Sequence, residues 1–488
     1  MSLRNVYQSR LEALIEVVLP LRPLLDARMA KFYSARLWRS ILPEKLSQQS
    51  TSLRPADLDI VYDQLLNFCR NLYGINGEST SDVGPPKNEF EVLAYDIFVQ
   101  ASALKSACVP PVPLLFRTGN EDEHLKEGQK LNALFMMSAK KYVEVEDMSF
   151  FVSQYARLGD LHRVVDFGSG KGYLSAMLNM RYGLSVLGLE LSSANVAAAR
   201  VRTERMIKQW SSLCRSVGLE SKTQPPGNGS LVFSSCEVTR NSDLDEIVAD
   251  SQSSKSNVDD SYLLCGLHTC GSLGNDLLDI FRRNSSAKAL VAIGCCYHFM
   301  AEAYSHLPEA TGEVAGDNCL FPMSSYLNSI RFSLGRTARM LASQSPERIL
   351  LSGIETSVQS MFFRAVLQEL LGRHGVHLGS LDRVGKIDVT GGIDFVQYVA
   401  AARRVITIPS EISDDDARAC LADFESLKST IAVIILIRVM LAPCLEQIVL
   451  LDRALFLLDQ KNVADVHLVS LFSPVVSPRT WAICAYKN

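Results

Sequence analysis

The sequence predicts an α/β fold: a doubly wound sheet of seven strands, with a helical N-terminal region and a large insertion before the last two strands. Short, continuously apolar segments alternate with helical segments after about residue 160. Such strands are typical of a parallel sheet that is covered on both faces. The chain ends in an amphipathic helix, a strand, a proline-containing turn and a strand. Its 488 residues exceed the roughly 250–300 residues at which a single core stops growing.

The N-terminal region is predicted to be helical over residues 1–115, because apolar residues recur there at helical spacing. They are Leu11, Leu14, Ile15 and Val18, and later Leu65, Leu66, Cys69 and Leu72. Residues 76–87 form a predicted loop, and the proline-rich residues 108–116 form a predicted linker.

The sheet begins in the next segment, which spans residues 116–309 and is predicted to hold the first part of the α/β core. Its strands are expected at residues 163–167, 184–190, 231–235, 262–267 and 289–295, with polar loops at 220–230 and 250–261. Residues 310–430 are a mostly helical insertion. Residues 431–488 close the core with a helix at 445–460 and strands at 466–472 and 480–487.

Charge and composition exclude several classes of protein. A net charge of −4 gives no overall attraction to nucleic acid, so such a substrate needs a local basic patch. The insertion and its surroundings offer candidates for that patch, although solvated helix faces are the favoured explanation for them. They are Arg331, Arg336, Arg339, Arg348, Arg403 and Arg404.

The compartment is predicted from cysteines and targeting signals. Twelve thinly spread cysteines, without a secretory signal pattern, predict reduced thiols in the cytoplasm, with the nucleus as the alternative. The most apolar run, residues 431–437, is interrupted by Arg438 and Pro443, so it falls short of the ~20 residues that span a bilayer. We therefore expect no membrane partner. The oligomeric state is not predicted.

A glycine-rich turn follows the first strand, in the segment RVVDFGSGKGYL at residues 163–174. Glycines at such a turn let the backbone approach a nucleotide-like ligand at the N-terminus of a helix. The spacing D-x-G-x-G-x-G is not the G-x-G-x-x-G of dinucleotide-binding proteins, because Tyr173 stands where the third glycine is needed. An NAD-dependent oxidoreductase is therefore disfavoured, and the sequence of a phosphate-binding loop is absent as well.

This turn resembles motif I of class I S-adenosylmethionine-dependent methyltransferases, whose sheets close with a helix, a strand, a turn and an antiparallel strand. The resemblance implies S-adenosylmethionine as the cofactor. The resemblance places Asp166 and the turn beside the methionine and adenosine groups of the cofactor. It also implies that Glu190, at the end of the second strand, accepts hydrogen bonds from the ribose hydroxyls. The alternative explanation for Glu190 and Glu237 is that they are solvated residues at the ends of strands. The predicted cofactor-binding residues are Asp166, Gly168, Ser169, Gly170, Gly172, Glu190, Leu191, Glu237 (near the adenine) and Lys141.

Histidines and cysteines follow the fourth and fifth strands, in GLHTCGSL and GCCYHF. Ligands of a doubly wound sheet bind at the carboxyl ends of its strands, so these side chains are expected near the transferred methyl group. His268, Cys270 and His298 are the candidate catalytic residues, and Cys295 and Cys296 accompany them. Three roles stay open: a general base, a zinc site with two ligands from each loop, or the shaping of the pocket. We expect no metal, because H-x-C and C-C-x-H differ from the usual C-x₂₋₄-C spacing.

From residue 130 onward the chain resembles the methyltransferase-like protein 25 family, whose relatives include proteins labelled ribosomal RNA adenine dimethylase domain-containing. The matching segments are MSAKKYVEV, VVDFGSGKGYLS, GLHTCGSL, GCCYHF, FPMS, GRTARMLA, FRAVLQ, LLDRALFL and SPRTWAICAYK. Val143 replaces the histidine of the family's K-K-x-H-E-V motif, while Lys141 and Glu144 remain to contact the cofactor or cap a helix. The four residues 268–271 (His-Thr-Cys-Gly) stand where adenine N6 methyltransferases carry an Asn/Asp-Pro-Pro-aromatic motif.

The function that the resemblance implies is an S-adenosylmethionine-dependent methyltransferase. The insertion and the helical N-terminal region suggest a macromolecular substrate, RNA or protein. The alternative is a non-catalytic scaffold that retains the methyltransferase fold and its cofactor pocket.

Overall fold

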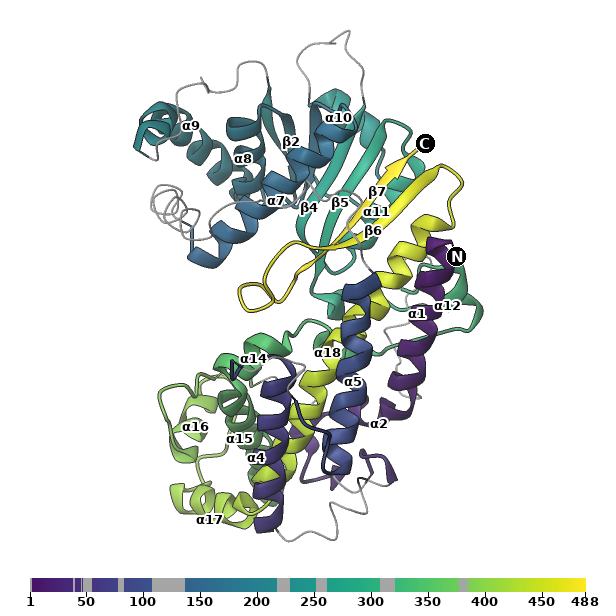
Figure 1. Ribbon diagram of the computed structural model, residues 1–488. Helices are drawn as coiled ribbons and strands as arrows, with labels where there is room; N and C mark the ends of the chain where they lie inside the picture. The colour runs from purple at the N-terminus through teal and green to yellow at the C-terminus, as the bar shows by residue number, and fades with distance from the viewer. Residues whose placement is uncertain are drawn as a thin grey trace. The chain divides into compact units, whose positions relative to one another are not determined.

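The computed structural model divides the chain into two compact units (Figure 1). A sheet unit contains residues 1–11, 104–335 and 447–488, and a helical unit contains residues 12–103 and 336–446. The N-terminal helices and the insertion thus share one unit. The structure describes residues 2–37, 40–44, 46, 55–77, 83–107, 137–216, 229–251, 261–307, 321–376, 384–385 and 387–488. The predicted linker at 108–116 and most of the predicted loops at 220–230 and 250–261 lie outside these residues.

The sheet unit contains one seven-stranded sheet in the order β3-β2-β1-β4-β5-β7-β6. All of its neighbouring strands are parallel except β7, which runs antiparallel between β5 and β6. This order confirms the predicted α/β fold with an antiparallel closing strand. The strands are β1 Arg163–Phe167, β2 Ser185–Glu190, β3 Leu231–Ser235, β4 Tyr262–Cys270, β5 Ala287–Cys295, β6 Val463–Ser470 and β7 Trp481–Lys487.

The central strands are mostly apolar because both faces of the sheet are covered. In β5, Ala289, Leu290, Val291 and Ile293 have no exposed surface. The helices of this unit are α7 Ala139–Leu158, α8 Tyr173–Tyr182, α9 Ser193–Ser216, α10 Leu244–Asp250, α11 Leu273–Arg283, α12 Ser325–Ser329 and the single turn η6 Tyr297–Phe299.

Strand β4 is longer than the sequence predicts, and this moves two candidate residues from a loop into the strand. The prediction ends it at Leu267, whereas the structure continues it to Cys270. The register shifts between Leu267 and Thr269, and His268 between them has a left-handed backbone (φ 65°). Beyond this irregularity the pairing resumes, and Cys270 lies opposite Cys295 of β5.

The described elements of the helical unit are all helices, which bury an apolar side against one another. Here Phe32, Phe362, Val366 and Leu436 have no exposed surface. Its helices, including those whose ends belong to the sheet unit, are α1 Leu3–Val18, η1 Leu19–Leu21, α2 Arg22–Asp26, η2 Met29–Lys31, α4 Pro55–Leu72, α5 Glu89–Ala107, α13 Arg336–Leu341, α14 Pro346–Ser352, α15 Ile354–Arg373, α16 Phe395–Ala402, α17 Asp414–Glu425 and α18 Lys428–Leu458.

Helix α18 extends well beyond the predicted closing helix. Its 31 residues continue through Arg438 and Pro443, where the sequence predicts a break. Arg438 is buried and donates to the backbone oxygens of Leu24 and Ala27, so it does not end the apolar run. Among the described residues α18 is the one helix long and apolar enough to cross a membrane, with a mean hydropathy of 2.2. However, 94% of its most apolar 18-residue window is buried inside the protein, as is usual for a core helix.

Candidate active site

The glycine turn leads from the end of β1 into α8, as predicted. Gly168, Gly170 and Gly172 all have left-handed backbones, with φ of 69°, 55° and 74°. Residues with a Cβ rarely adopt this conformation, which explains the glycines. A Cβ on Gly172 would lie 2.7 Å from the Phe233 ring, whereas a Cβ on Gly170 would meet nothing closer than 3.9 Å. The turn therefore packs tightly on the Gly172 side and is open at Gly170.

Glu190 ends β2, and its carboxylate joins the turn to the start of α9. Its Oε2 accepts a hydrogen bond from the Gly170 N–H (3.0 Å), while its Oε1 accepts from the Ser192 N–H (3.0 Å) and the Asn195 side chain (3.1 Å). A carboxylate has about four acceptor positions, so about one remains for a ligand. Glu190 is thus more than a solvated strand end.

Asp166 lies below the turn and is 1% exposed. The Ser175 hydroxyl donates to its Oδ2 at 2.6 Å, and the Cys265 thiol lies 3.9 Å from its Oδ1. Burial raises the pKa of Asp166 to about 7, although the hydrogen bond from Ser175 acts in the opposite direction. This carboxyl group therefore supports the turn from within the protein core.

Replacing Asp166 with asparagine is expected to stabilise the protein more at pH 8 than at pH 4. Between its ordinary pKa of 3.8 and its folded pKa of about 7, the folded state holds a proton that the unfolded chain has lost. Stability therefore falls as pH rises through this range, and asparagine removes that loss. Urea unfolding should show an extra stability at pH 8 on the order of 4 kcal/mol. An equal effect of the substitution at both pH values would contradict the assignment.

Three other predicted cofactor residues lie one or two residues beyond the ends of β1, β2 and β3. Leu191 follows Glu190 and is 70% exposed, and Glu237 is exposed two residues beyond β3. Ser169 donates its N–H to the Leu189 oxygen, and its buried hydroxyl has no hydrogen-bond partner among the described residues. An unsatisfied buried hydroxyl is costly, so it fits a place that a polar ligand occupies.

Lys141 lies on the first turn of α7, where its N–H donates to the Ser138 side chain that caps the helix. Its Nζ lies 4.5 Å from the centroid of the Tyr173 ring, and the Arg202 guanidinium lies 4.4 Å from the same centroid. The pKa of Lys141 is lowered, first by partial burial and then by the charges of Lys171 and Arg202. Lys141 and Arg202 thus lie against Tyr173, the first residue of α8, and Lys171 is a third cation close to them.

His268 is paired with Glu144, a residue that the sequence leaves without a specific role. The His268 Nε2 lies 3.1 Å from the Glu144 Oε1, and the two side chains are 29% and 5% exposed. Burial favours a higher pKa for Glu144, but contacts with His268 and Ser477 and the charge of Lys140 give a net lowering. Glu144 therefore holds the histidine ring from α7, a long way along the chain from β4.

Three thiols meet at the ends of β4 and β5. The Sγ atoms of Cys270 and Cys295 are 2.9 Å apart, and Cys296 completes a group whose sulfur atoms all lie within 4.8 Å of one another. The hydrogen bond from Cys295 lowers the pKa of Cys270 to about 6, against the effect of burial, while the pKa of Cys295 is raised. The cysteines at the ends of β4 and β5 therefore lie close to one another, as the sequence predicts.

His298 is placed differently. It lies in η6, directly after β5, and its ring centroid is 4.1 Å from that of Phe299. Neither His298 nor His268 belongs to the group of ligand atoms that the three thiols form among the described residues. The four-ligand set of two histidines and two cysteines is therefore not assembled here.

Two buried charged residues near the end of α18 support the strand ends, and the sequence does not single them out. Asp452 accepts hydrogen bonds from the Met323 N–H and from the N–H and hydroxyl of Ser324, at 2.6–2.8 Å. Arg453 donates to the Asn275 side chain from Nε (3.0 Å) and from Nη2. The FPMS and LLDRALFL segments thus contact each other inside the protein.

The predicted basic patch loses one member. Arg339 is 1% exposed, because its helix α13 turns that side chain into the protein. Arg403 is exposed but donates to the backbone oxygens of Ile408, Pro409 and Ile412, so it also supports a local turn. Arg331 lies 5.1 Å from the Tyr304 ring centroid. Packing thus explains several of these arginines.

The strand order and the glycine turn define a class I methyltransferase fold. Residues 140–303 match a family model described as a methyltransferase domain. The chain is 26% identical to the human protein described as "Probable methyltransferase-like protein 25", over 99% of this chain and 97% of the human one. It is 28% identical to the mouse protein of the same description, over 78% and 80% of the two chains. The chain therefore contains a methyltransferase domain and resembles methyltransferase-like protein 25 over most of its length, as predicted.

Proposed function

We propose that this protein is an S-adenosylmethionine-dependent methyltransferase that acts on a macromolecule, RNA or protein. The observation that carries the proposal is the open glycine turn at the end of β1, with Glu190 beside it at the end of β2. This is the edge of a doubly wound sheet where ligands bind. The methyltransferase domain and the related proteins support the reaction class.

The residues at the turn fit the cofactor. The hydroxyl of Ser169 needs a polar partner, the side of Gly170 is open, and Glu190 keeps about one acceptor position. The exposed Leu191 offers an apolar surface suited to a flat base. When bound, the cofactor supplies an electrophilic methyl group on a sulfonium ion. The task of the protein is then mainly to align the acceptor with that methyl group.

On the acceptor side, His268 is the candidate proton acceptor. Glu144 contacts its Nε2, and this contact orients the ring. At the ends of β4 and β5 it is placed to take a proton from an acceptor that must lose one.

The cations around Tyr173 support an anionic substrate. Lys141 and Lys171 are exposed beside the turn, and Arg202 donates to the Lys171 oxygen at 2.9 Å. A local group of positive charges can attract a polyanion even though the whole chain carries a net charge of −4. Within the proposed substrate class, this favours RNA as the first fraction to test.

Replacing Gly170 with aspartate is expected to abolish cofactor binding while the fold is retained. The new Cβ would meet no atom closer than 3.9 Å, and aspartate tolerates a left-handed backbone better than most residues. Its carboxylate would occupy the open side of the turn and repel that of Glu190. Calorimetry with S-adenosylhomocysteine should show a loss of at least about 100-fold, or about 2.8 kcal/mol. Unchanged affinity would place the cofactor elsewhere.

The proposed reaction is tested by transfer of tritiated methyl groups into lysate from cells that lack this protein, separated into RNA and protein fractions. Label in one fraction, dependent on Gly170, supports the enzyme and identifies its substrate class. Tight cofactor binding without label in any fraction favours the scaffold instead.

A further inference from the structure

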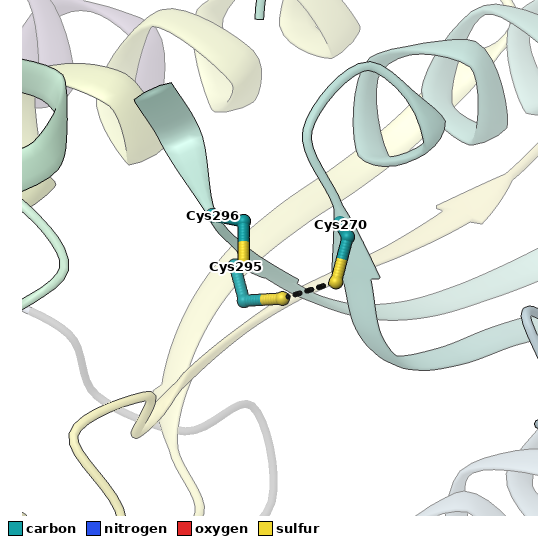
Figure 2. A group of neighbouring side chains, drawn as sticks. All are labelled: Cys270, Cys295 and Cys296. Carbon is teal, nitrogen blue, oxygen red and sulfur yellow. Dashed lines mark hydrogen bonds between the residues drawn. The ribbon is translucent and has the colours of Figure 1, made fainter. Parts of the chain in front are cut away.

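The three thiols at the ends of β4 and β5 form a compact group to which the proposed function gives no role. Figure 2 shows the Cys270 and Cys295 side chains pointing toward each other, with Cys296 next to Cys295. Cys270 and Cys295 are directly paired in the register of the two strands. All three sulfur atoms lie within 4.8 Å of one another, and the side chain of Cys270 is exposed to solvent.

Two strained residues bring these thiols together. Successive residues of a strand point to opposite faces, so Cys295 and Cys296 would normally point apart. Cys296 instead has a left-handed backbone (φ 51°), and its sulfur joins the same group as that of Cys295. His268 (φ 65°) is left-handed at the facing strand end, two residues before Cys270. Left-handed residues other than glycine cost roughly 1–2 kcal/mol each and are concentrated at functional sites.

We propose that Cys270, Cys295 and Cys296 bind one thiophilic divalent cation of the zinc type. Tetrahedral zinc with Zn–S distances of about 2.3 Å holds its sulfur ligands about 3.8 Å apart. That separation lies between the shortest sulfur distance of 2.9 Å and the 4.8 Å that encloses the group. Three thiolates would bind the ion, their protons would pass to the solvent, and the fourth position would stay open toward the exposed side.

This site differs from the one that the spacing of residues along the chain suggests. The pattern C-x₂₋₄-C finds ligands within one loop, whereas these three come from two parallel strands that meet only in the folded sheet. A disulfide between Cys270 and Cys295 is the competing outcome. A disulfide would join only two of the three thiols, and it would not explain why the left-handed backbone of Cys296 brings a third sulfur atom into the group. The third sulfur therefore favours a metal.

The experiment uses the full chain, purified under reducing conditions, stripped with a chelator and titrated with Zn²⁺ or Co²⁺. The expected result is one equivalent of zinc, and a cobalt form with the absorption of thiolate charge transfer and of a tetrahedral ion. Cys270→Ser and Cys296→Ser should each lose this equivalent. Cys236→Ser is the matched control, because Cys236 is a partly exposed free thiol outside the group, and it should bind as the wild type does.

The cobalt spectrum of the wild-type protein tests thiolate ligation even if a serine variant fails to fold. The proposal is overturned if the reduced wild-type protein takes up no equivalent of zinc, or if both serine variants keep it. A Cys270–Cys295 disulfide in protein alkylated at lysis, together with no metal uptake after reduction, also overturns it. The metal content does not depend on methyl transfer. Gly170→Asp should therefore retain the ion while it loses the cofactor, which separates a failure of this inference from a failure of the proposed function.

Discussion

Replacing Arg453 with methionine is expected to lower the stability of the sheet unit by about 3–5 kcal/mol. The side chain is 2% exposed, and methionine has a similar length but no charge. The substitution leaves the Asn275 oxygen without two donors and leaves the buried carboxylate of Asp452 without its neighbouring positive charge. It also removes the guanidinium that lies 5.4 Å from the ring centroid of the buried Tyr297. The loss is large because several buried polar groups lose a partner at once.

The measurement is urea-induced unfolding of both proteins in the absence of cofactor. Arg282→Met is the matched control on α11, since Arg282 is partly exposed, pairs with nearby Asp279 and lies 6.0 Å from the centroid of the Phe456 ring. A partly exposed pair of this kind contributes at most about 1 kcal/mol. If the two arginine variants lose similar amounts of stability, the buried contacts of Arg453 with Asn275, Asp452 and Tyr297 do not contribute the expected stability.

Removing the imidazole of His268 is expected to reduce methyl transfer by about 10²–10⁴-fold without weakening cofactor binding. His268 lies at the end of β4, whereas the glycine turn and Glu190 hold the cofactor side, so His268→Ala should change the rate alone. Glu144→Gln should cause a smaller loss of rate, because it replaces the carboxylate that lies 3.1 Å from the imidazole Nε2 and orients the ring.

The rates are measured with the lysate fraction that accepts the labelled methyl group, and affinity is measured separately by calorimetry. His162→Ala is the control, because that histidine is exposed just before β1 and its side chain is 77% accessible. Wild-type rates in His268→Ala would remove the proposed proton acceptor. A parallel loss of cofactor affinity would instead assign His268 to binding.

Local patterns predicted much of the fold and the glycine turn after β1. The run of apolar strands and the D-x-G-x-G-x-G turn depend on residues close together in sequence, and the structure has both. Ser169 lies within the turn, and Leu191 follows Glu190 directly, so their positions also depend on neighbours in the sequence. Patterns with a short period are governed by local sterics and burial, so a single sequence reveals them.

The acceptor side was harder to predict because its contacts join distant segments. Glu144 meets His268 only after α7 packs beside β4, and no spacing in the sequence indicates this pair. Arg453 interrupts an apolar helix, which in sequence resembles a solvated position, yet it is buried against Asn275. Pro443 likewise predicted a helix end, but burial of α18 outweighs the single hydrogen bond that proline removes.

The position of β7 has a consequence for how the protein is made. Residues 481–487 pair with β5 on one side and β6 on the other, so β5 keeps an unpaired edge until this last strand has been synthesised. An open edge on an apolar strand invites pairing with other chains. Synthesis proceeds from the N-terminus, so the nascent sheet stays open at β5 while most of the chain is already outside the ribosome. A chaperone that shields strand edges would act during this interval, and the thiols at the end of β5 would reach their final surroundings only afterwards.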